Sequence, residues 1–296
     1  RVSQEFLQAS VGQGSMFLAD EMLKRIDHNI YLRLEELQKY AKDAAVQETV
    51  GESNQKFEKL NNVQAYITEK DQEWTSTPAE TITPLMQELI DNQLSEELRA
   101  TFIEIYEKKY GYKVYGEILI TNKYGANVAQ TGKTSDYRQD DEEWWQVARE
   151  KGWYIGDIEY DESVGMYGIS MAVRIDDNEG NWLGVIKAVV PVGGIAREAE
   201  IATRKYETTE IELVTQEGQR IYATKPFRFL ENISQKEFFK KLESESDFFV
   251  AEEAGRERLF AYASSKGYRD FTGLPWVLVV KYDVEEILEP IFVLRN

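Results

Sequence analysis

The chain has 296 residues, a formal net charge of −18 at pH 7, and no cysteine. Its length favours two domains, and a hydrophobic share of 42% is enough for a globular core. The acidic excess argues against binding to nucleic acid or anionic lipid, and the lack of cysteine excludes disulfides, thiolate metal sites and cysteine nucleophiles. We find neither an apolar run long enough to span a membrane nor a signal-peptide layout, so we expect a soluble piece.

Apolar residues that recur at intervals of three and four predict one long helix from Ser3 to about Val46. At 1.5 Å per residue this helix would extend about 65 Å, longer than one compact domain, which is typical of a stalk. Gly12 and Gly14 weaken its first turns.

Three further helices are predicted, at 54–73, 78–94 and 95–109. The second begins with a start signal in which Thr77 is the capping residue and Pro78 the first helical residue. Ser95 is the predicted cap of the third helix. The first hundred residues are therefore expected to be mainly helical.

After Gly111 the pattern changes to strands. A hairpin is predicted around Gly125, and alternating residues and apolar runs predict the later strands. The predicted strands lie at 117–121, after the turn around Gly125 as far as Thr131, at 169–175 and from Trp182 to Val190. A helix from Gly194 to Tyr206 should then lead into a second set of strands.

The second set repeats the first at an offset of 93 residues. The matching pairs are Gly125 with Gly218, Val128 with Ile221, Thr131 with Thr224, Met166 with Leu259, Tyr167 with Phe260, and Ile169 with Tyr262. Each copy has a gap of about 35 residues after its hairpin, and Ser234 and Glu237 are expected to cap a helix in the second gap. We therefore predict an α+β fold: a long N-terminal helix and two PAS-like modules, each an antiparallel sheet with flanking helices, around 115–192 and 209–283.

The sequence offers little for catalysis, metal binding or nucleotide binding. His28 is the only histidine and is expected to be a surface or packing residue of the long helix. Gly132-Lys133-Thr134 resembles the end of a phosphate-binding loop, but Asn127 stands where that pattern needs glycine. We predict no catalytic residues, no metal site and no cofactor.

Aromatic and hydrogen-bonding side chains are concentrated in 136–145 and 153–167. Such mixtures line small-molecule pockets, although aromatic clusters are as often core packing. At these residues the chain resembles the double Cache sensor family of histidine kinases and chemoreceptors. The resemblance rests on Asp136-Tyr137, Trp144-Trp145, 153–163 and Gly184-Val185-Ile186.

The resemblance implies a membrane-distal module that binds a small ligand and a membrane-proximal module that leads into a membrane span. An amino-acid-binding subset of the family has a motif whose aromatic positions match Tyr137, Trp144, Trp145 and Tyr160. The arginine position of that motif is Glu142 in this chain, and the first aspartate position is Glu162. The second aspartate position falls near Val190, where there is no acidic residue. Replacement of the arginine by an acid argues against recognition of a ligand carboxylate by a bidentate pair.

The expected domains are a stalk helix (1–47), a distal ligand-binding module (48–203) and a proximal module (204–296). We expect the pocket in the distal module, with the proximal pocket filled or small. The candidate ligand-binding residues are Tyr137, Arg138, Asp140, Glu142, Trp144, Trp145, Tyr160, Asp161, Ser163 and Tyr167. Because acids surround the aromatic faces, an amine or other cation is the favoured ligand.

The leading hypothesis is an extracytoplasmic small-molecule sensor of a membrane receptor, a histidine kinase first and a chemoreceptor as the alternative. Such a receptor would be a homodimer anchored through flanking membrane segments. A protein-interaction or mechanical module without a small ligand is the other class considered. An enzyme is disfavoured because no pair of nucleophile and base is visible.

Overall fold

A computed structural model describes residues 2–199 and 206–293. The chain divides into two compact units. We call Leu32–Gly194 the first-sheet unit, and Ile195–Asn296 with Arg1–Tyr31 the second-sheet unit. The predicted boundary at 203–204 lies outside the described residues. Within the residues described, none of the helices combines the length and apolarity needed to cross a membrane.

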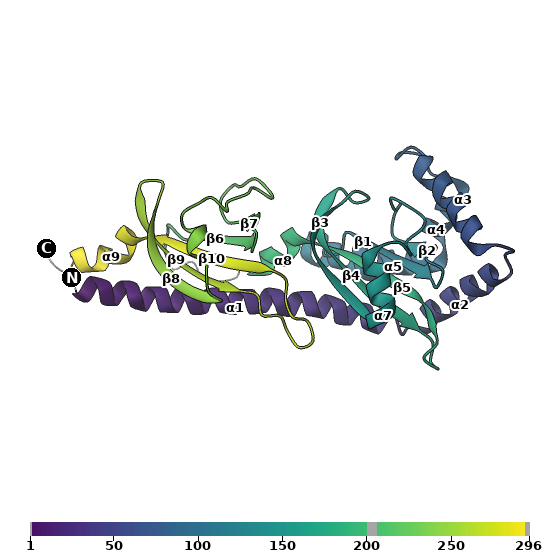
Figure 1. Ribbon diagram of the computed structural model, residues 1–296, viewed down its shortest axis with the longest axis horizontal. Coiled ribbons are helices and arrows are strands. Elements are labelled where there is room, and N and C mark those ends of the chain that lie inside the picture. Colours follow the sequence, from purple (N-terminus) through teal and green to yellow (C-terminus); the bar gives the residue numbers. More distant parts are fainter. Residues whose placement is uncertain (1, 200–205, 294–296) are drawn as a thin grey trace. The chain divides into compact units, whose positions relative to one another are not determined.

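The long N-terminal helix is confirmed as α1, Val2–Tyr40, but it ends six residues before the predicted end at Val46 (Figure 1). The chain turns after Tyr40, and the Asp43 carboxylate accepts a hydrogen bond from Ala45 N at 2.8 Å. This capping contact starts a new helix, α2, Ala44–Glu58. His28 is an exposed residue of α1, and its ring centre lies 4.5 Å from that of Tyr268.

The remaining N-terminal helices begin at caps other than those predicted. The helix predicted at 54–73 is wrong, because Asn62 starts a separate helix by accepting a hydrogen bond from Ala65 N. The start at Thr77 is also wrong, because Thr83 caps the next helix and Pro84 is its first residue. Asn92, not Ser95, caps the following helix. These elements are α3 Val63–Ser76, α4 Pro84–Asp91, α5 Gln93–Leu98, a π-helix Arg99–Glu104 and α6 Ile105–Tyr110.

Two five-stranded antiparallel sheets are found in the described residues, as predicted. The first has the order β2-β1-β5-β4-β3, and the second has the corresponding order β7-β6-β10-β9-β8. The first-sheet strands are β1 Glu117–Asn122, β2 Asn127–Gln130, β3 Trp153–Asp161, β4 Met166–Asp176 and β5 Trp182–Pro191. The second-sheet strands are β6 Glu210–Thr215, β7 Arg220–Ala223, β8 Ser246–Glu253, β9 Arg256–Ser264 and β10 Trp276–Asp283.

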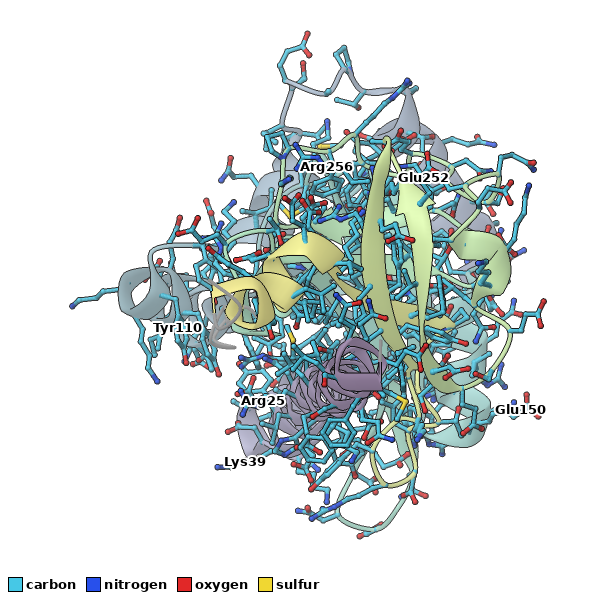
Figure 2. The ribbon with its side chains drawn as sticks, turned by 90° about the vertical axis from the view of Figure 1, so that its left-hand side faces the viewer. Arg25, Lys39, Tyr110, Glu150, Glu252 and Arg256 are labelled. Carbon is cyan, nitrogen blue, oxygen red and sulfur yellow. The ribbon has the colours of Figure 1, made fainter. Side chains whose placement is uncertain are left out.

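The sequence reading missed the edge strands β3 and β8, which occupy part of the predicted gaps. In the first gap the helix α7, Glu143–Lys151, precedes β3 and packs on the first sheet (Figure 1). The second gap holds only a 3-10 helix, Phe239–Lys241, so the helix expected after Ser234 is wrong. The other helices are α8 Val192–Ala199 and α9 Val284–Val293. At the turn between β8 and β9, Glu252 and Arg256 extend outward (Figure 2).

The hairpins of the two sheets are equivalent at the level of single hydrogen bonds. Thr131 Oγ1 accepts from Ile118 N at 3.0 Å, and Thr224 Oγ1 accepts from Ile211 N at 3.0 Å. Both pairs differ by 93 positions (224−131 and 211−118), which confirms the repeat in this part. On the fourth strand the offset is smaller: through the strand pairings Ala172 corresponds to Tyr262, an offset of 90 (262−172). The predicted match of Ile169 with Tyr262 is therefore wrong by three residues.

Candidate functional site

One face of the first sheet carries charged side chains among apolar ones. Alternation along the strands places Glu117 and Leu119 of β1 on the face that also carries Lys187 of β5. The buried rings of Trp144 and Trp145, from α7, pack on this face with Leu119. The sheet and α7 thus bring strand charges and tryptophans into one layer.

Lys187 is the cation of this face. Its Nζ lies 5.2 Å from the ring centre of Trp144 and 3.9 Å from Asp161 Oδ2. The side chains of Lys187 and Asp161 are each 12% exposed, so their attraction is only partly screened by water. An ammonium over a tryptophan face is itself attracted by about 0.5–2 kcal/mol.

Ser163 joins two carboxyl groups at the end of this face. Its Oγ lies 2.5 Å from Glu117 Oε2 and also contacts Asp161 Oδ1. A serine hydroxyl has one proton, so it can donate to only one of them, and the other contact needs a protonated carboxyl group. Burial, together with the nearby Asp161 charge, raises the pKa of Glu117 to about 7. Glu117 is therefore the group that carries the extra proton near neutral pH.

Two further acids approach Lys187 from the segment before α7. Burial raises the pKa of Asp136 to about 6, while Gln139 Nε2 donates to its carboxylate at 2.6 Å and opposes that shift. Burial also raises the pKa of Glu142, and the Lys187 charge opposes this. At the outer strands, Ser170 Oγ donates to Glu159 at 2.7 Å.

We name these residues the sheet-face cluster: Glu117, Asp136, Glu142, Trp144, Glu159, Asp161, Ser163, Ser170 and Lys187. It has five carboxyl groups and a single lysine, which interacts with four of them, so the cluster is acidic even when Glu117 is protonated. Perturbed carboxyl groups beside an aromatic wall are typical of a binding site. Across the described residues, no group of three or more His, Asp or Glu side chains is arranged to hold a metal ion.

Four of the sequence-predicted residues belong to this cluster: Glu142, Trp144, Asp161 and Ser163. Trp145 is adjacent but structural, because its Nε1 donates to Thr121 Oγ1 at 2.9 Å and its ring packs against Trp182. Tyr160 and Tyr167 pack on each other with ring centres 5.0 Å apart, and Tyr160 is 53% exposed.

The other predicted residues lie elsewhere. Arg138 and Asp140 form an ion pair with each other at 2.6 Å. Tyr137 is buried in a separate apolar cluster, with its ring centre 5.8 Å from that of Trp74. It is the preceding residue, Asp136, whose carboxylate interacts with Lys187 and Glu142.

Glu117 and Lys187 lie in strands outside the aromatic segments and were not among the sequence-predicted residues. The available signal was a single charge inside an otherwise apolar strand, since an isolated charge in such a strand needs a partner. Lys187 stands alone in the run Trp182–Pro191, and Glu117 opens the apolar strand β1.

The corresponding face of the second sheet is filled by its own side chains. Phe238 stacks on Phe260 with ring centres 4.8 Å apart, and Phe249 stacks on the other side at 5.4 Å. Lys281 is 2% exposed and pairs with Glu212 and Glu253, each at 3.0 Å. Here the lysine is paired with carboxylates on a face packed with aromatic rings. Cavities of about 470 and 780 Å³ lie elsewhere in the second-sheet unit, so the expectation that the proximal pocket is filled or small stays a prediction.

No protein-family model matches the sequence, and no curated protein sequence is similar to it. Solved structures are similar in fold. The ligand-binding domain of the Pseudomonas aeruginosa amino acid chemoreceptor PctB, in complex with L-Arg, has a TM-score of 0.56 at 12% identity, covering 93% of this chain and 96% of that one. The corresponding domain of Pseudomonas fluorescens CtaA, with L-serine, has a TM-score of 0.55 at 12% identity, covering 94% and 98%. Campylobacter jejuni Tlp3, with L-valine, has a TM-score of 0.52 at 15% identity, covering 95% and 98%.

These structures are similar over nearly the whole chain, including both sheets. The fold expected from the sequence resemblance, two tandem PAS-like modules after a long helix as in double Cache sensor domains, is confirmed. At such low identity the similarity establishes the fold, and function has to be argued from the site.

Proposed function

We propose that this chain is the extracytoplasmic sensor region of a membrane receptor and binds a small molecule at the sheet-face cluster. The observation that carries the proposal is the imbalance around Lys187, where four carboxyl groups interact with one cation beside the ring of Trp144. A cluster that served stability alone would be balanced in charge. Around Lys281 in the second sheet, Arg220 and Arg258 supply the further cations that pair with the three carboxylates. The fold shared with chemoreceptor ligand-binding domains supports the same function.

The receptor would be held in the membrane by segments that flank this region, and it would act as a homodimer. A chemoreceptor or a histidine kinase is the proposed output, with the described similarities favouring chemoreceptors. We propose a sensing role rather than an enzymatic one, because the hydroxyl that contacts the carboxyl groups of Glu117 and Asp161, Ser163 Oγ, has no histidine in the cluster to act as its base.

The proposed ligand carries an ammonium group. An ammonium would compensate the surplus carboxylates, whereas a dianion would add to the repulsion. The face of Trp144 is already covered by Lys187, so the ligand cation is expected at Asp136, Glu142 and Asp161 rather than on that ring. Lys187 can pair with a ligand carboxylate, and a zwitterionic amino acid therefore matches both charges of the site.

Calorimetric titration with L-amino acids, the amines that lack their carboxylate, and dicarboxylates tests this proposal. We expect amino acids to bind to the wild type. In Lys187→Met their affinity should fall at least about tenfold, the loss typical of a charge-assisted hydrogen bond. The affinity of Lys187→Met for the amines should be unchanged or higher than that of the wild type, because the lysine that repels their ammonium group is absent. Lys151→Met, at an exposed position at the end of α7, is the matched control.

Tight binding of a dicarboxylate, or equal binding of amino acids by wild type and Lys187→Met, would contradict the assignment of the site. No binding by any compound in the panel would instead favour a protein-interaction or mechanical module.

A further inference from the structure

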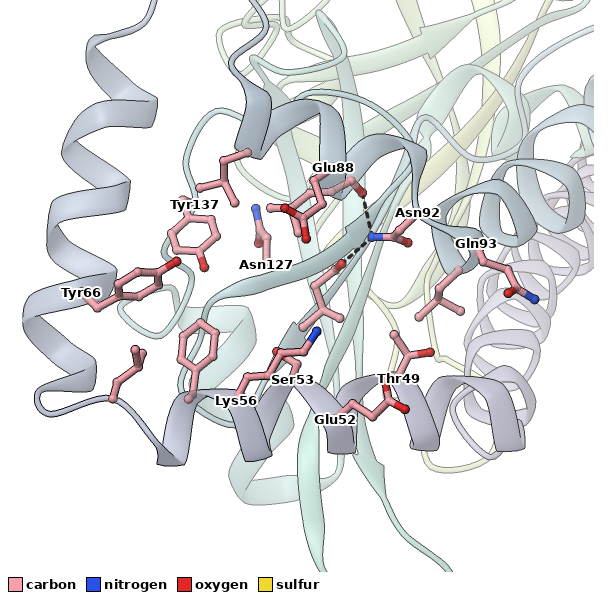
Figure 3. Close-up of a pocket in the computed structure, with 16 residues that line it drawn as sticks. Thr49, Glu52, Ser53, Lys56, Tyr66, Glu88, Asn92, Gln93, Asn127 and Tyr137 are labelled. Atoms are coloured by element: carbon pink, nitrogen blue, oxygen red, sulfur yellow. Dashed lines mark hydrogen bonds between the residues drawn. The ribbon is translucent and has the colours of Figure 1, made fainter.

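A cavity lies in the first-sheet unit, away from the sheet-face cluster. It has a volume of about 440 Å³ and is enclosed by α2, α3, α4 and β2 (Figure 3). That volume is within the range of small-molecule sites. Its apolar lining comes from Phe57, Tyr66, Leu85, Leu89, Leu94 and Val128.

The inner part of this cavity has a hydroxyl group without a partner. Tyr137 is 3% exposed, and its hydroxyl has no hydrogen-bond partner among the residues that the structure describes. Figure 3 shows the hydroxyl groups of Tyr66 and Tyr137 directed toward the interior of the cavity. This hydroxyl oxygen is open to the cavity rather than fully buried, so it can form a hydrogen bond with a ligand atom there.

Asn127 adds a second unpaired group on the same wall. Its Nδ2 donates at 3.0 Å to Thr134 Oγ1 and at 3.0 Å to the Asp136 carbonyl oxygen, which can only accept. These bonds fix the orientation of the amide. Its Oδ1 has no partner within the described part of the chain, and Asn127 lies beside Tyr137 in Figure 3.

The charged side chains of the cavity lining belong to exposed residues. Burial raises the pKa of Tyr137, and the charge of one of these residues, Glu88, adds to that shift. Glu52, Lys56 and Glu88 line the opening and are exposed, whereas the buried lining residues are uncharged. An anion that reached the inner wall would lose its hydration and be repelled by Glu88, and a cation would find only that one carboxylate, on an exposed residue. The inner end therefore suits an uncharged group.

We propose that this cavity is a second binding site, for an uncharged ring compound that carries one hydroxyl group. The ring would pack between Phe57, Tyr66 and Leu89, where aromatic contact adds to apolar burial. The ligand hydroxyl is the smallest group that can both accept from the Tyr137 hydroxyl and donate to a carbonyl oxygen. The site is independent of the ammonium ligand proposed for the sheet-face cluster.

Titration with p-cresol and toluene, followed by ligand-observed NMR, tests the proposal on the whole chain. The two molecules have the same ring and methyl group and differ in one hydroxyl. We expect saturable binding of p-cresol and binding of toluene at least about fivefold weaker, the loss expected for one hydrogen bond. Tyr137→Phe should reduce the affinity for p-cresol to nearly that for toluene, while the ring keeps its contact with Trp74.

Two tryptophan variants of α4 locate the site. Leu85→Trp places a bulky ring in the cavity and should abolish binding of p-cresol. Gln87→Trp changes an exposed residue of the same helix outside the lining and should leave binding unchanged. Trp144→Ala, in the sheet-face cluster, should also leave it unchanged. Thermal unfolding of each variant verifies that it is folded.

The proposal is overturned if p-cresol shows no saturable binding to the wild type, or if toluene binds equally well. It is also overturned if Tyr137→Phe, a folded variant by thermal unfolding, retains the wild-type affinity for p-cresol. Loss of amino-acid binding in Lys187→Met with p-cresol binding retained would separate the two sites.

Discussion

The ammonium group of Lys187 lies over the ring of Trp144, 5.2 Å from its centre, and 3.9 Å from the Asp161 carboxylate. The chain thus supplies its own cation to the tryptophan for which the sequence favoured a ligand cation. This lysine also opposes the rise in the pKa values of Glu117, Asp136 and Glu142. It is the one side chain that interacts with most members of the sheet-face cluster.

Lys187→Met should destabilise the first-sheet unit more at pH 8 than at pH 5. At pH 8 the surrounding carboxyl groups are ionised and lose their counter-charge, at a cost of about 1–2 kcal/mol, whereas at pH 5 several of them are protonated. Hydrogen exchange of the β5 amides at the two pH values measures the difference. Lys187→Arg keeps the charge and is the control; an equal loss in both variants, or at both pH values, would contradict this explanation.

We expect the contribution of Glu117 to stability to fall as the pH rises from about 4.5 to about 7. Its folded pKa of about 7 exceeds the ordinary value of 4.5, so the folded state binds this proton more tightly. The contribution is complete below pH 4.5 and is lost as pH rises to the folded pKa. A shift of this size corresponds to about 3 kcal/mol in the free energy of unfolding.

Glu117→Gln removes this titration and should flatten the stability curve between pH 5 and pH 8. Thermal unfolding at several pH values is the measurement. Glu143→Gln, at an exposed position in α7, should keep the wild-type slope. The assignment of the proton to Glu117 is wrong if the slope persists unchanged in Glu117→Gln.

The sequence was most informative where a pattern is local and repeated. Gly125 and Gly218 both have φ values near +85°, which glycine tolerates, and this hairpin signal located both modules. Capping residues were less informative because several serines, threonines and asparagines stand before each helix, and tertiary packing decides between Thr77 and Thr83. The sheet-face cluster was only half predicted, since pairing of strands far apart in sequence brings Glu117 and Lys187 together.

Replacement of the equivalent threonines, Thr131 and Thr224, should reduce stability equally in the two modules. Thr131→Val and Thr224→Val each remove a hydroxyl that accepts from a backbone N–H at 3.0 Å. Each should reduce stability by about 1 kcal/mol, the net value of one such bond. Hydrogen exchange of the Ile118 and Ile211 amides locates each effect within its own sheet. Protection that remains at both amides would show that these bonds contribute nothing.

Removal of the Asp27 carboxylate should greatly reduce the stability of the second-sheet unit. Asp27 is 2% exposed, and its carboxylate accepts from Ser265 Oγ at 2.6 Å and from Gly267 N at 2.9 Å. Asp27→Ala leaves these buried donors unpaired and should cost about 2–4 kcal/mol. Urea unfolding followed by hydrogen exchange measures the loss. Asp20→Ala, which removes the partly exposed ion pairs with Lys24 and Lys266, should cost at most about 1 kcal/mol.

Two glycines of α1, only two residues apart, predict opposite effects of the same substitution. A Cβ added at Gly14 meets no atom within 4 Å, so Gly14→Ala should stabilise the helix by about 0.5–1 kcal/mol. A Cβ added at Gly12 would lie 2.1 Å from the Phe248 ring of β8. The ring would have to move out of its packed position, a cost of about 1–3 kcal/mol that exceeds the gain in helix propensity.

Thermal unfolding of Gly12→Ala and Gly14→Ala should therefore give a lower and a higher midpoint than the wild type. The double variant Gly12→Ala with Phe248→Ala makes room for the new methyl group. Relative to Phe248→Ala alone, it should recover the stabilisation that alanine gives to a helix interior. If Gly12→Ala is as stabilising as Gly14→Ala in the wild-type background, then the ring of Phe248 does not pack on α1 at this residue.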